Sequence, residues 1–272
     1  MDEAAGKQSQ GIQSIEVGLA LIRVLAEARS ALSLTEVSRR AAMAPAKAHR
    51  YLVSFTRAGL VERVPATGQY DLGPLALSLG LAAIGRLDTQ RLALDALARL
   101  RLAVDETVAL AVWGDSGAVI VRWEESSRPV TVNVRVGSTL SPVTSATGRL
   151  FAAFLDGART EAAIEAEFSR GAVPTSNGRT LDRAGYQGLL EDIRRTGISR
   201  VVGDYLAGVD ALSVPVFDLE GRIVYALTAL GPHGSFDVKP GGALERVLRR
   251  AAGELSARLG YVASSRAGMQ LK

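Results

Sequence analysis

Six cationic side chains gather between Val37 and Arg63, and this stretch holds a single acidic residue, Glu62. They are Arg39, Arg40, Lys47, Arg50, Arg57 and Arg63. Cations at this density suit a polyanion, because guanidinium groups grip phosphate or a guanine edge bidentately and ammonium groups hold phosphates as point charges. A run of charge alone is more typical of an ordinary solvated surface. The elements that carry these residues therefore decide between the two interpretations.

Two helices are predicted ahead of most of these cations. Apolar residues recur at helical spacing across residues 12–25, which predicts an amphipathic first helix. Ser33 and Glu36 then have the spacing of a capping box, with Ser33 accepting from the backbone and Glu36 reaching back to it. A short second helix is expected from there to about Ala42.

A third helix and a hairpin follow. Pro45 fits the first turn of a helix, where its missing N–H costs nothing, and Gly59 ends that helix. Residues 60–64 and 69–72 alternate like strands around the turn-forming residues 65–68, which predicts a β-hairpin. Helix, helix, turn, helix and hairpin make a complete small domain.

The third helix is the candidate reader of a DNA major groove, because the second helix of a helix-turn-helix pair places its N-terminal half against base edges. If Ala48, Leu52 and Phe55 point inward, the cations of this helix point outward. Arg50 is expected to bind a guanine edge. Lys47 and Arg57 are expected to bind phosphates. The predicted DNA-contacting residues are Ser33, Pro45, Ala46, Lys47, His49, Arg50, Ser54, Arg57 and Arg63, the last at the hairpin.

The remainder of the chain predicts a second, α+β domain. Pro74 can start a helix whose apolar stripe of Leu75, Leu79 and Ala82 must be covered by something. We expect a first domain over 1–73, a connecting helix over 74–86 and a second domain over 87–264; the family resemblance described below implies that these are a DNA-binding domain, a linker helix and an effector-binding domain. Within the last, strands are predicted at 108–113, 118–123, 130–134, 211–217 and 223–230, helices at 92–104, 147–155, 161–168, 181–195 and 242–259, and a surface loop at 171–180. The short turn at 218–221 makes the last two strands antiparallel neighbours.

Composition excludes several classes of protein. Of the 272 residues, 47% are hydrophobic and 22% charged, which is a globular balance. The absence of Cys excludes disulfides, thiolate metal sites and a cysteine nucleophile. No Walker A, GxGxxG, HExxH or GxSxG motif occurs, so no enzyme, metal or cofactor is expected. No uncharged stretch reaches the roughly 20 residues of a bilayer span and no signal peptide is evident, so we expect a cytoplasmic protein without a membrane partner.

The order and spacing of several short blocks are similar to those of the IclR family of bacterial transcription regulators. The resemblance covers nearly the whole chain and rests on residues 33–37, 42–52, 58–61, 70–73, 145–149 and 208–232. It implies a winged helix-turn-helix, a linker helix and a GAF-like domain that binds a small effector, assembled as homodimers or homotetramers. Members repress or activate catabolic genes, often for small organic or aromatic acids. Ala42 departs from the pattern, since the family usually has Gly there, so the turn is expected to be slightly re-aimed.

The resemblance also implies an effector pocket. At the places of Val201, Ala211 and Leu230 the family often carries polar residues, so their apolar character here predicts a ligand with a larger apolar body. If a helix begins at residues 146–148, its free N–H groups make a place for a carboxylate. The candidate effector-binding residues are Ser145, Ala146, Thr147, Gly148, Val201, Asp204, Ala211, Thr228 and Leu230.

Several of these residues also have plain structural interpretations. Gly148 is expected to let the ligand approach closely, whereas Ser145 can simply cap the helix. Asp204 can line the mouth of the pocket or end a strand, and Thr228 can bind ligand or merely fit a sheet. Trp113 and Trp123 more often belong to a core than to a ligand platform, and His233 is expected in a loop.

These observations predict a homo-oligomeric, ligand-responsive transcription regulator, more often a repressor, that binds double-stranded DNA and a small organic acid. An effector near residues 145–148 would favour one arrangement of the linker helices and change the spacing of two recognition helices. Two alternatives stay open. One is an enzyme or metabolite-binding module that uses the winged domain for protein contacts. The other is an architectural protein that binds DNA indiscriminately.

Overall fold

The computed structural model describes residues 11–28, 30–86, 88–127, 134–169 and 171–262. The chain divides into two compact units, Met1–Leu87 and Asp88–Lys272. Within the described residues, no helix combines the length and the apolar character needed to cross a bilayer.

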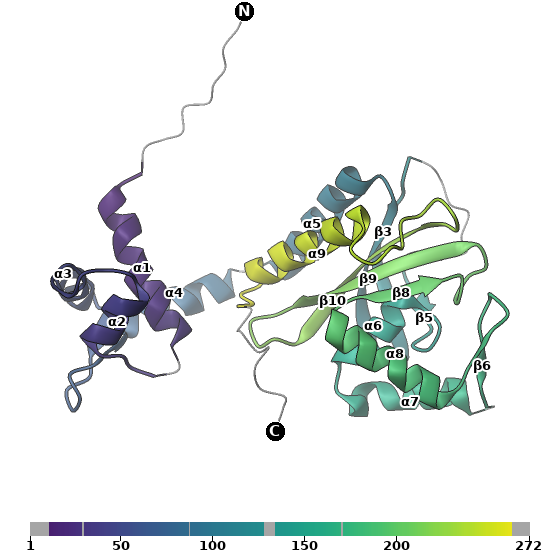
Figure 1. Cartoon of the computed structure of the whole chain (residues 1–272), viewed down its shortest axis with the longest axis horizontal. Coiled ribbons are helices and arrows are strands. Elements are labelled where there is room, and N and C mark those ends of the chain that lie inside the picture. Colours follow the sequence, from purple (N-terminus) through teal and green to yellow (C-terminus); the bar gives the residue numbers. More distant parts are fainter. Residues whose placement is uncertain (1–10, 29, 87, 128–133, 170, 263–272) are drawn as a thin grey trace, which may run out of the picture. The chain divides into compact units, whose positions relative to one another are not determined.

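The first unit consists of three helices, a two-stranded hairpin and a fourth helix (Figure 1). The order predicted from the sequence is confirmed. The elements are α1 (Gln13–Glu27), α2 (Leu34–Arg40), α3 (Pro45–Arg57), the antiparallel strands β1 (Val61–Arg63) and β2 (Tyr70–Leu72), and α4 (Pro74–Gly85).

A small apolar core holds this unit together. Leu21 of α1, Val37 of α2 and Leu52 of α3 are all fully buried in it. Gly18 lets α1 lie close to α3, since a Cβ atom there would come within 2.9 Å of the Phe55 ring. The core thereby fixes which face of α3 is left outward.

The connection between α2 and α3 differs in detail from the expectation. The Ser33 hydroxyl caps α2 by accepting from the Glu36 N–H at 3.2 Å, as predicted. The Glu36 carboxylate, however, accepts hydrogen bonds from Arg39 and Arg40 instead of reaching back. The helix ends at Arg40, and Ala42 takes a left-handed backbone conformation with φ +49°. Ala there carries the strain that Gly avoids.

The second unit is built on a six-stranded antiparallel sheet with the order β5-β4-β3-β10-β9-β8. The strands are β3 (Thr107–Gly114), β4 (Gly117–Glu124), β5 (Thr139–Leu140), β8 (Ser199–Val202), β9 (Val209–Phe217) and β10 (Ile223–Pro232). Strands β9 and β10 are antiparallel neighbours across the predicted turn. In β10, Thr228 stands opposite Ser213 of β9 and Ala109 of β3.

Helices cover both faces of this sheet. On one face α5 (Thr89–Val104) and α9 (Ala243–Arg258) lie side by side, and on the other lie α6 (Ala146–Phe154) and α8 (Arg183–Thr196) (Figure 1). Helix α7 (Gly157–Phe168) follows α6 in the chain. The sheet face under α6 is the one that matters for function, because α6 begins directly above β9 and β10.

Some of the sequence predictions for this unit were incomplete. The strand expected at 130–134 lies outside the described residues except for Val134, which belongs to no strand. Strands β5 and β8 were missed. The segment expected as a loop at 171–180 contains a short hairpin, β6 (Val173–Pro174) with β7 (Thr180–Leu181), in which Thr175 is buried.

Candidate nucleic-acid interface and ligand cavity

Helix α3 presents a row of cations that form no ion pair with any residue that the structure describes. Ala48 and Leu52 are fully buried and so orient the helix. Lys47, Arg50 and Arg57 lie on the opposite side, are exposed, and form no salt bridge within the described residues. Unpaired cations on one exposed helical face attract phosphate without first having to break an ion pair.

The cations of α2 are different. Hydrogen bonds from Arg39 and Arg40 hold the pKa of the Glu36 carboxyl at about 2, so that carboxylate remains charged and offsets part of their charge. The density of cations seen in the sequence is thus concentrated on α3 by the fold.

Four other predicted DNA-contacting residues hold the unit together. The Ser33 hydroxyl caps α2, and the Ser54 hydroxyl donates to the Arg50 carbonyl at 3.2 Å. His49 Nδ1 lies 3.3 Å from the Tyr70 hydroxyl, which ties α3 to β2. Arg63 Nε donates to the Gly68 carbonyl at 3.1 Å and braces the hairpin turn. Pro45 and Ala46 are exposed in the first turn of α3. Contact of these residues with DNA stays a prediction.

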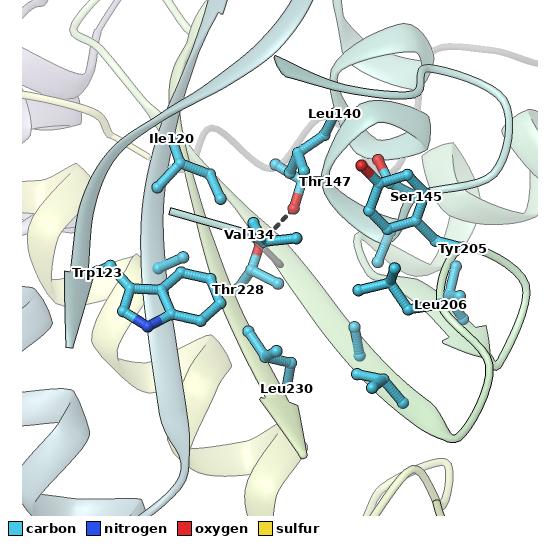
Figure 2. Close-up of a pocket in the computed structure, with 15 residues that line it drawn as sticks. Ile120, Trp123, Val134, Leu140, Ser145, Thr147, Tyr205, Leu206, Thr228 and Leu230 are labelled. Carbon is cyan, nitrogen blue, oxygen red and sulfur yellow. Dashed lines mark hydrogen bonds between the residues drawn. The ribbon is translucent and has the colours of Figure 1, made fainter. Parts of the chain in front are cut away.

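The second unit contains a cavity between the sheet and the beginning of α6, with an empty volume of about 480 Å³ (Figure 2). It is lined mainly by apolar side chains. Seven of the nine candidate effector-binding residues line it: Ser145, Ala146, Thr147, Val201, Ala211, Thr228 and Leu230.

Polar groups on the cavity wall come mostly from the start of α6 and from β10. The hydroxyls of Thr147 and Thr228 lie 2.8 Å apart, and Thr228 donates to the Ser213 hydroxyl at 2.8 Å. Ser145 is occupied as the helix cap, donating to the Ser141 carbonyl at 2.6 Å and accepting from the Gly148 N–H at 2.9 Å. The backbone N–H groups of residues 146 and 147 have no hydrogen-bond partner among the described residues. Both residues line the cavity.

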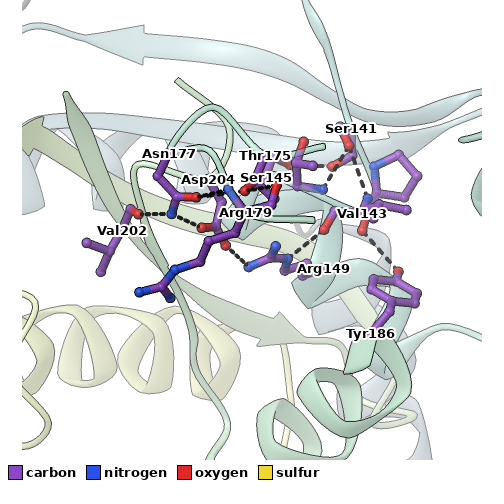
Figure 3. A network of polar contacts seen from close by, with 12 residues as sticks. Ser141, Val143, Ser145, Arg149, Thr175, Asn177, Arg179, Tyr186, Val202 and Asp204 are labelled. Carbon is purple, nitrogen blue, oxygen red and sulfur yellow. Dashed lines mark hydrogen bonds and ion pairs between the residues drawn. The ribbon is translucent and has the colours of Figure 1, made fainter. Parts of the chain in front are cut away.

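Two candidate effector-binding residues do not line the cavity. Each has a structural role in its place. A Cβ atom on Gly148 would lie 2.1 Å from the Ser141 carbonyl oxygen, so this glycine admits the neighbouring backbone and not a ligand. Asp204 turns away from the cavity, accepting from Arg149 Nη1 at 2.8 Å and from Asn177 Nδ2 at 2.6 Å (Figure 3).

Several cavity-lining residues were not predicted. Trp123 forms part of the wall, so its expected core role was incomplete, whereas Trp113 packs on Phe151 with ring centroids 5.9 Å apart. Tyr205 and Leu206 reach the cavity from the segment between β8 and β9 (Figure 2). Burial raises the pKa of the Tyr205 hydroxyl, which keeps it protonated at neutral pH. Of these, only the tryptophan carried a signal in the sequence.

Two further sequence questions concern His233 and metal binding. His233 does lie beyond β10, exposed, but its Nδ1 contacts the buried Asp210 carboxylate at 3.0 Å. Within the parts of the chain that the structure describes, no three acidic or histidine side chains gather in a way that would hold a metal ion.

A winged helix-turn-helix unit with unpaired cations on its second motif helix, followed by an α+β unit with a mainly apolar cavity, defines a ligand-responsive DNA-binding regulator of transcription. Residues 14–65 match the IclR helix-turn-helix domain, and residues 81–257 match the family described as bacterial transcriptional regulator IclR C-terminal. These matches cover most of the chain, and the protein belongs to the IclR family. Its first unit binds DNA and its second binds a small-molecule effector.

Relatives and solved structures agree with this assignment. The chain is 28% identical over 258 residues to the glycerol operon regulatory protein of Streptomyces griseus, covering 93% of this chain and 98% of the relative. It is 27% identical over 219 residues to the DNA-binding transcriptional repressor YiaJ of Escherichia coli, covering 80% and 77%. The crystal structure of Pseudomonas aeruginosa HmgR is 37% identical with a TM-score of 0.80, covering 93% of this chain and all of that one. An IclR homologue from Microbacterium hydrocarbonoxydans, complexed with 4-hydroxybenzoate, shares the fold at 24% identity and a TM-score of 0.55, covering 89% and 98%.

Proposed function

We propose that the protein is a homo-oligomeric repressor of catabolic genes and that its effector is a small organic acid with a sizeable apolar body. The observation that carries this proposal is the pair of unpartnered backbone N–H groups, at residues 146 and 147, on the wall of an otherwise apolar cavity. The repressor sign follows the relatives named as repressors, YiaJ of Escherichia coli and AllR of Klebsiella pneumoniae.

The acid group fits the start of α6. The first N–H groups of a helix lack intrahelical partners and lie at the positive end of its dipole, so they favour a carboxylate. Burying an anion without such donors would be costly. The effector's carboxylate is therefore expected against residues 146 and 147, with the Thr147 hydroxyl beside it.

The remainder of the ligand must suit apolar walls. Ile120, Trp123 and Leu140 offer aliphatic and aromatic surface, and the cavity has few hydrogen-bonding groups far from α6. A small, highly oxygenated acid would leave polar atoms unpaired there, at about 1–3 kcal/mol each. An aromatic or branched monocarboxylate satisfies both ends, and one solved homologue binds such a molecule, 4-hydroxybenzoate.

Oligomerisation is inferred from α4. This helix exposes Leu75, Leu77, Leu79 and Leu81, with exposed fractions of 39–66%. Four large apolar side chains on a 12-residue helix are an unusual surface for an isolated chain. Leu75 and Leu79 lie on one face of the helix, and Leu77 and Leu81 lie on the opposite face. A second copy of the same helix would cover one of these faces and hold two α3 helices at a fixed separation, as a symmetric operator requires. We accordingly keep residues 1–73 as the DNA-binding domain, 74–86 as a linker helix and 87–264 as the effector domain.

The proposal is tested with fluorescence anisotropy on DNA from upstream of the adjacent operon, at two salt concentrations, with and without candidate aromatic acids. We expect salt-dependent operator binding that an aromatic monocarboxylate alters. Ligand entry should also change the emission of Trp123, one of the two tryptophans, and Trp113→Phe isolates that signal. Chemical turnover of the acid, or ligand binding without DNA affinity, would instead support the enzymatic alternative. Sequence-independent binding without a ligand response would support the architectural one.

A further inference from the structure

A second hollow lies beyond the cavity, on the outer side of the segment that joins β8 to β9. It is an open groove with an empty volume of about 930 Å³. Its lining includes three arginines, Arg149, Arg179 and Arg200, and one acidic residue, Asp204. The charged lining residues therefore sum to +2, which is unusual for a concave surface outside the DNA-binding unit.

The arginines of this groove are incompletely neutralised. Arg149 is 2% exposed, donates to the Val143 carbonyl and to Asp204, and leaves its Nη2 atom buried without a partner. Arg179 is exposed, and its guanidinium makes no hydrogen bond or ion pair with any described residue (Figure 3). Arg200 binds the Glu245 carboxylate, which it shares with Arg249. Asp204 thus balances Arg149, Glu245 is shared by two arginines, and Arg179 is left without a counter-charge among the described residues.

We propose that this groove is a second ligand site, separate from the effector cavity, that takes a small dianion, a phosphate group or a dicarboxylate. The charge of the lining matches a dianion, and Arg179 offers a free guanidinium fork suited to paired oxygens. Ser176 and the backbone around Gly208 add polar groups at the rim. A dianion placed there supplies the acceptors that Arg179 lacks and competes with Asp204 for the charge of Arg149.

The groove and the effector cavity share one segment of chain. Between β8 and β9, Tyr205 and Leu206 line the cavity, whereas Asp204 and Ala207 line the groove. The segment is held from the groove side, because the Ser176 hydroxyl donates to the Tyr205 carbonyl at 2.8 Å. A dianion that weakens the Arg149–Asp204 ion pair changes how firmly Tyr205 is held against the cavity. Dianion and effector should therefore alter each other's affinity by the same factor; this coupling rests on the proposed effector cavity, and the dianion site does not.

The experiment is isothermal titration calorimetry of the full chain with inorganic phosphate and, separately, succinate, at constant ionic strength set with chloride. We expect saturable binding of at least one of them, at one site per protomer. Arg179→Ala should weaken it about tenfold or more, as loss of a charge-assisted contact does. Asp204→Asn keeps the shape of the side chain but removes the competing charge, so it should tighten binding.

Two controls make the outcome decisive. Arg159→Ala removes another exposed arginine, on α7, that has no described ion-pair partner, and it should leave the affinity unchanged. Thr228→Val alters the effector cavity and should also leave dianion binding unchanged. Equal affinities of the Arg179 and Arg159 variants, or no heat beyond that of added chloride, would overturn the site. Failure of the effector or DNA assays alone would not contradict the dianion site. The preference between phosphate and succinate identifies the source of the dianion.

Discussion

Replacing Arg50 by Ala separates base reading from general attraction to DNA. Arg50 is exposed, has no ion-pair partner within the described residues, and lies one turn into α3. Ala has the highest helix propensity, so the substitution should leave the fold intact. Any loss of operator binding then belongs to the interface.

The expected magnitude follows from the contact that a guanidinium makes with a guanine. A bidentate contact to O6 and N7 is worth about 1–3 kcal/mol. A symmetric dimer makes that contact twice, so the operator complex should lose about 2–6 kcal/mol, or about 30-fold to 20,000-fold in affinity. Nonspecific DNA should lose much less, and one base preference in each half-site should relax.

Lys47→Ala and Arg57→Ala are the matched comparisons on the same helix. Each removes a phosphate contact, so each should weaken all sequences alike and lower the slope of log affinity against log salt by about 2 per dimer. Anisotropy titrations on operator and scrambled DNA at four salt concentrations measure both quantities. If Arg50→Ala lowers affinity for the two DNAs equally, Arg50 is a phosphate contact and the assigned base reader is wrong.

Further substitutions test the fold and the assembly. Ala42→Gly relieves a left-handed alanine and should raise the free energy of unfolding by about 0.5–1 kcal/mol in urea titrations; a loss of stability would contradict the strain. Gly148→Ala should destabilise by several kcal/mol, because its methyl group would meet the Ser141 carbonyl oxygen. If Gly148→Ala kept normal stability and lost only effector binding, Gly148 would instead be a residue that lets the ligand approach. Leu79→Glu on α4 should shift sedimentation toward the monomer, whereas Leu102→Glu on α5, at a leucine that is even more exposed, should not. Burial raises the pKa of Glu245, but hydrogen bonds from arginine outweigh it and hold that pKa at about 2. Because the folded-state pKa lies below the unfolded value, this stabilisation is present above about pH 4.5 and is lost as the pH falls toward 2. In Glu245→Gln, the free energy of unfolding should depend less on pH between about 4.5 and 2. Its dependence on pH near 7 should stay the same, because Glu245 does not titrate there.

The first unit could be predicted well because its signals are local. The cap at Ser33, the proline at the start of α3 and the glycine after it mark helix ends by the chemistry of single residues. The outward face of α3 then follows from helical periodicity. What the sequence did not reveal is that Glu36 neutralises the cations of α2, since a carboxylate with both a capping and an ion-pairing option gives no local sign of its choice.

The second unit was harder for a physical reason. Strands β5, β6 and β7 have two residues each, too few for any periodicity, and they form because longer strands or tight turns present unpaired backbone groups. Val201, Ala211 and Leu230 were found through the family resemblance, and the residues at the start of α6 through the chemistry of a helix N-terminus. Tyr205 and Leu206 were missed because they lie in an irregular segment, whose course is fixed by contacts distant in sequence.

The misassigned residues point to one feature of the site. Gly148 was a candidate because a glycine at a helix start lets a ligand approach closely, and Asp204 because it could line the mouth of the pocket, yet each positions a neighbour of the cavity instead. Gly148 admits the backbone before α6, and Asp204 holds the segment after β8 through Arg149. The segment after β8, which brings Tyr205 to the cavity wall, is therefore held by an ion pair outside the cavity. In the proposed scheme, an effector that moves this segment would change the Arg149–Asp204 pair, and an anion that binds Arg149 would change the cavity wall.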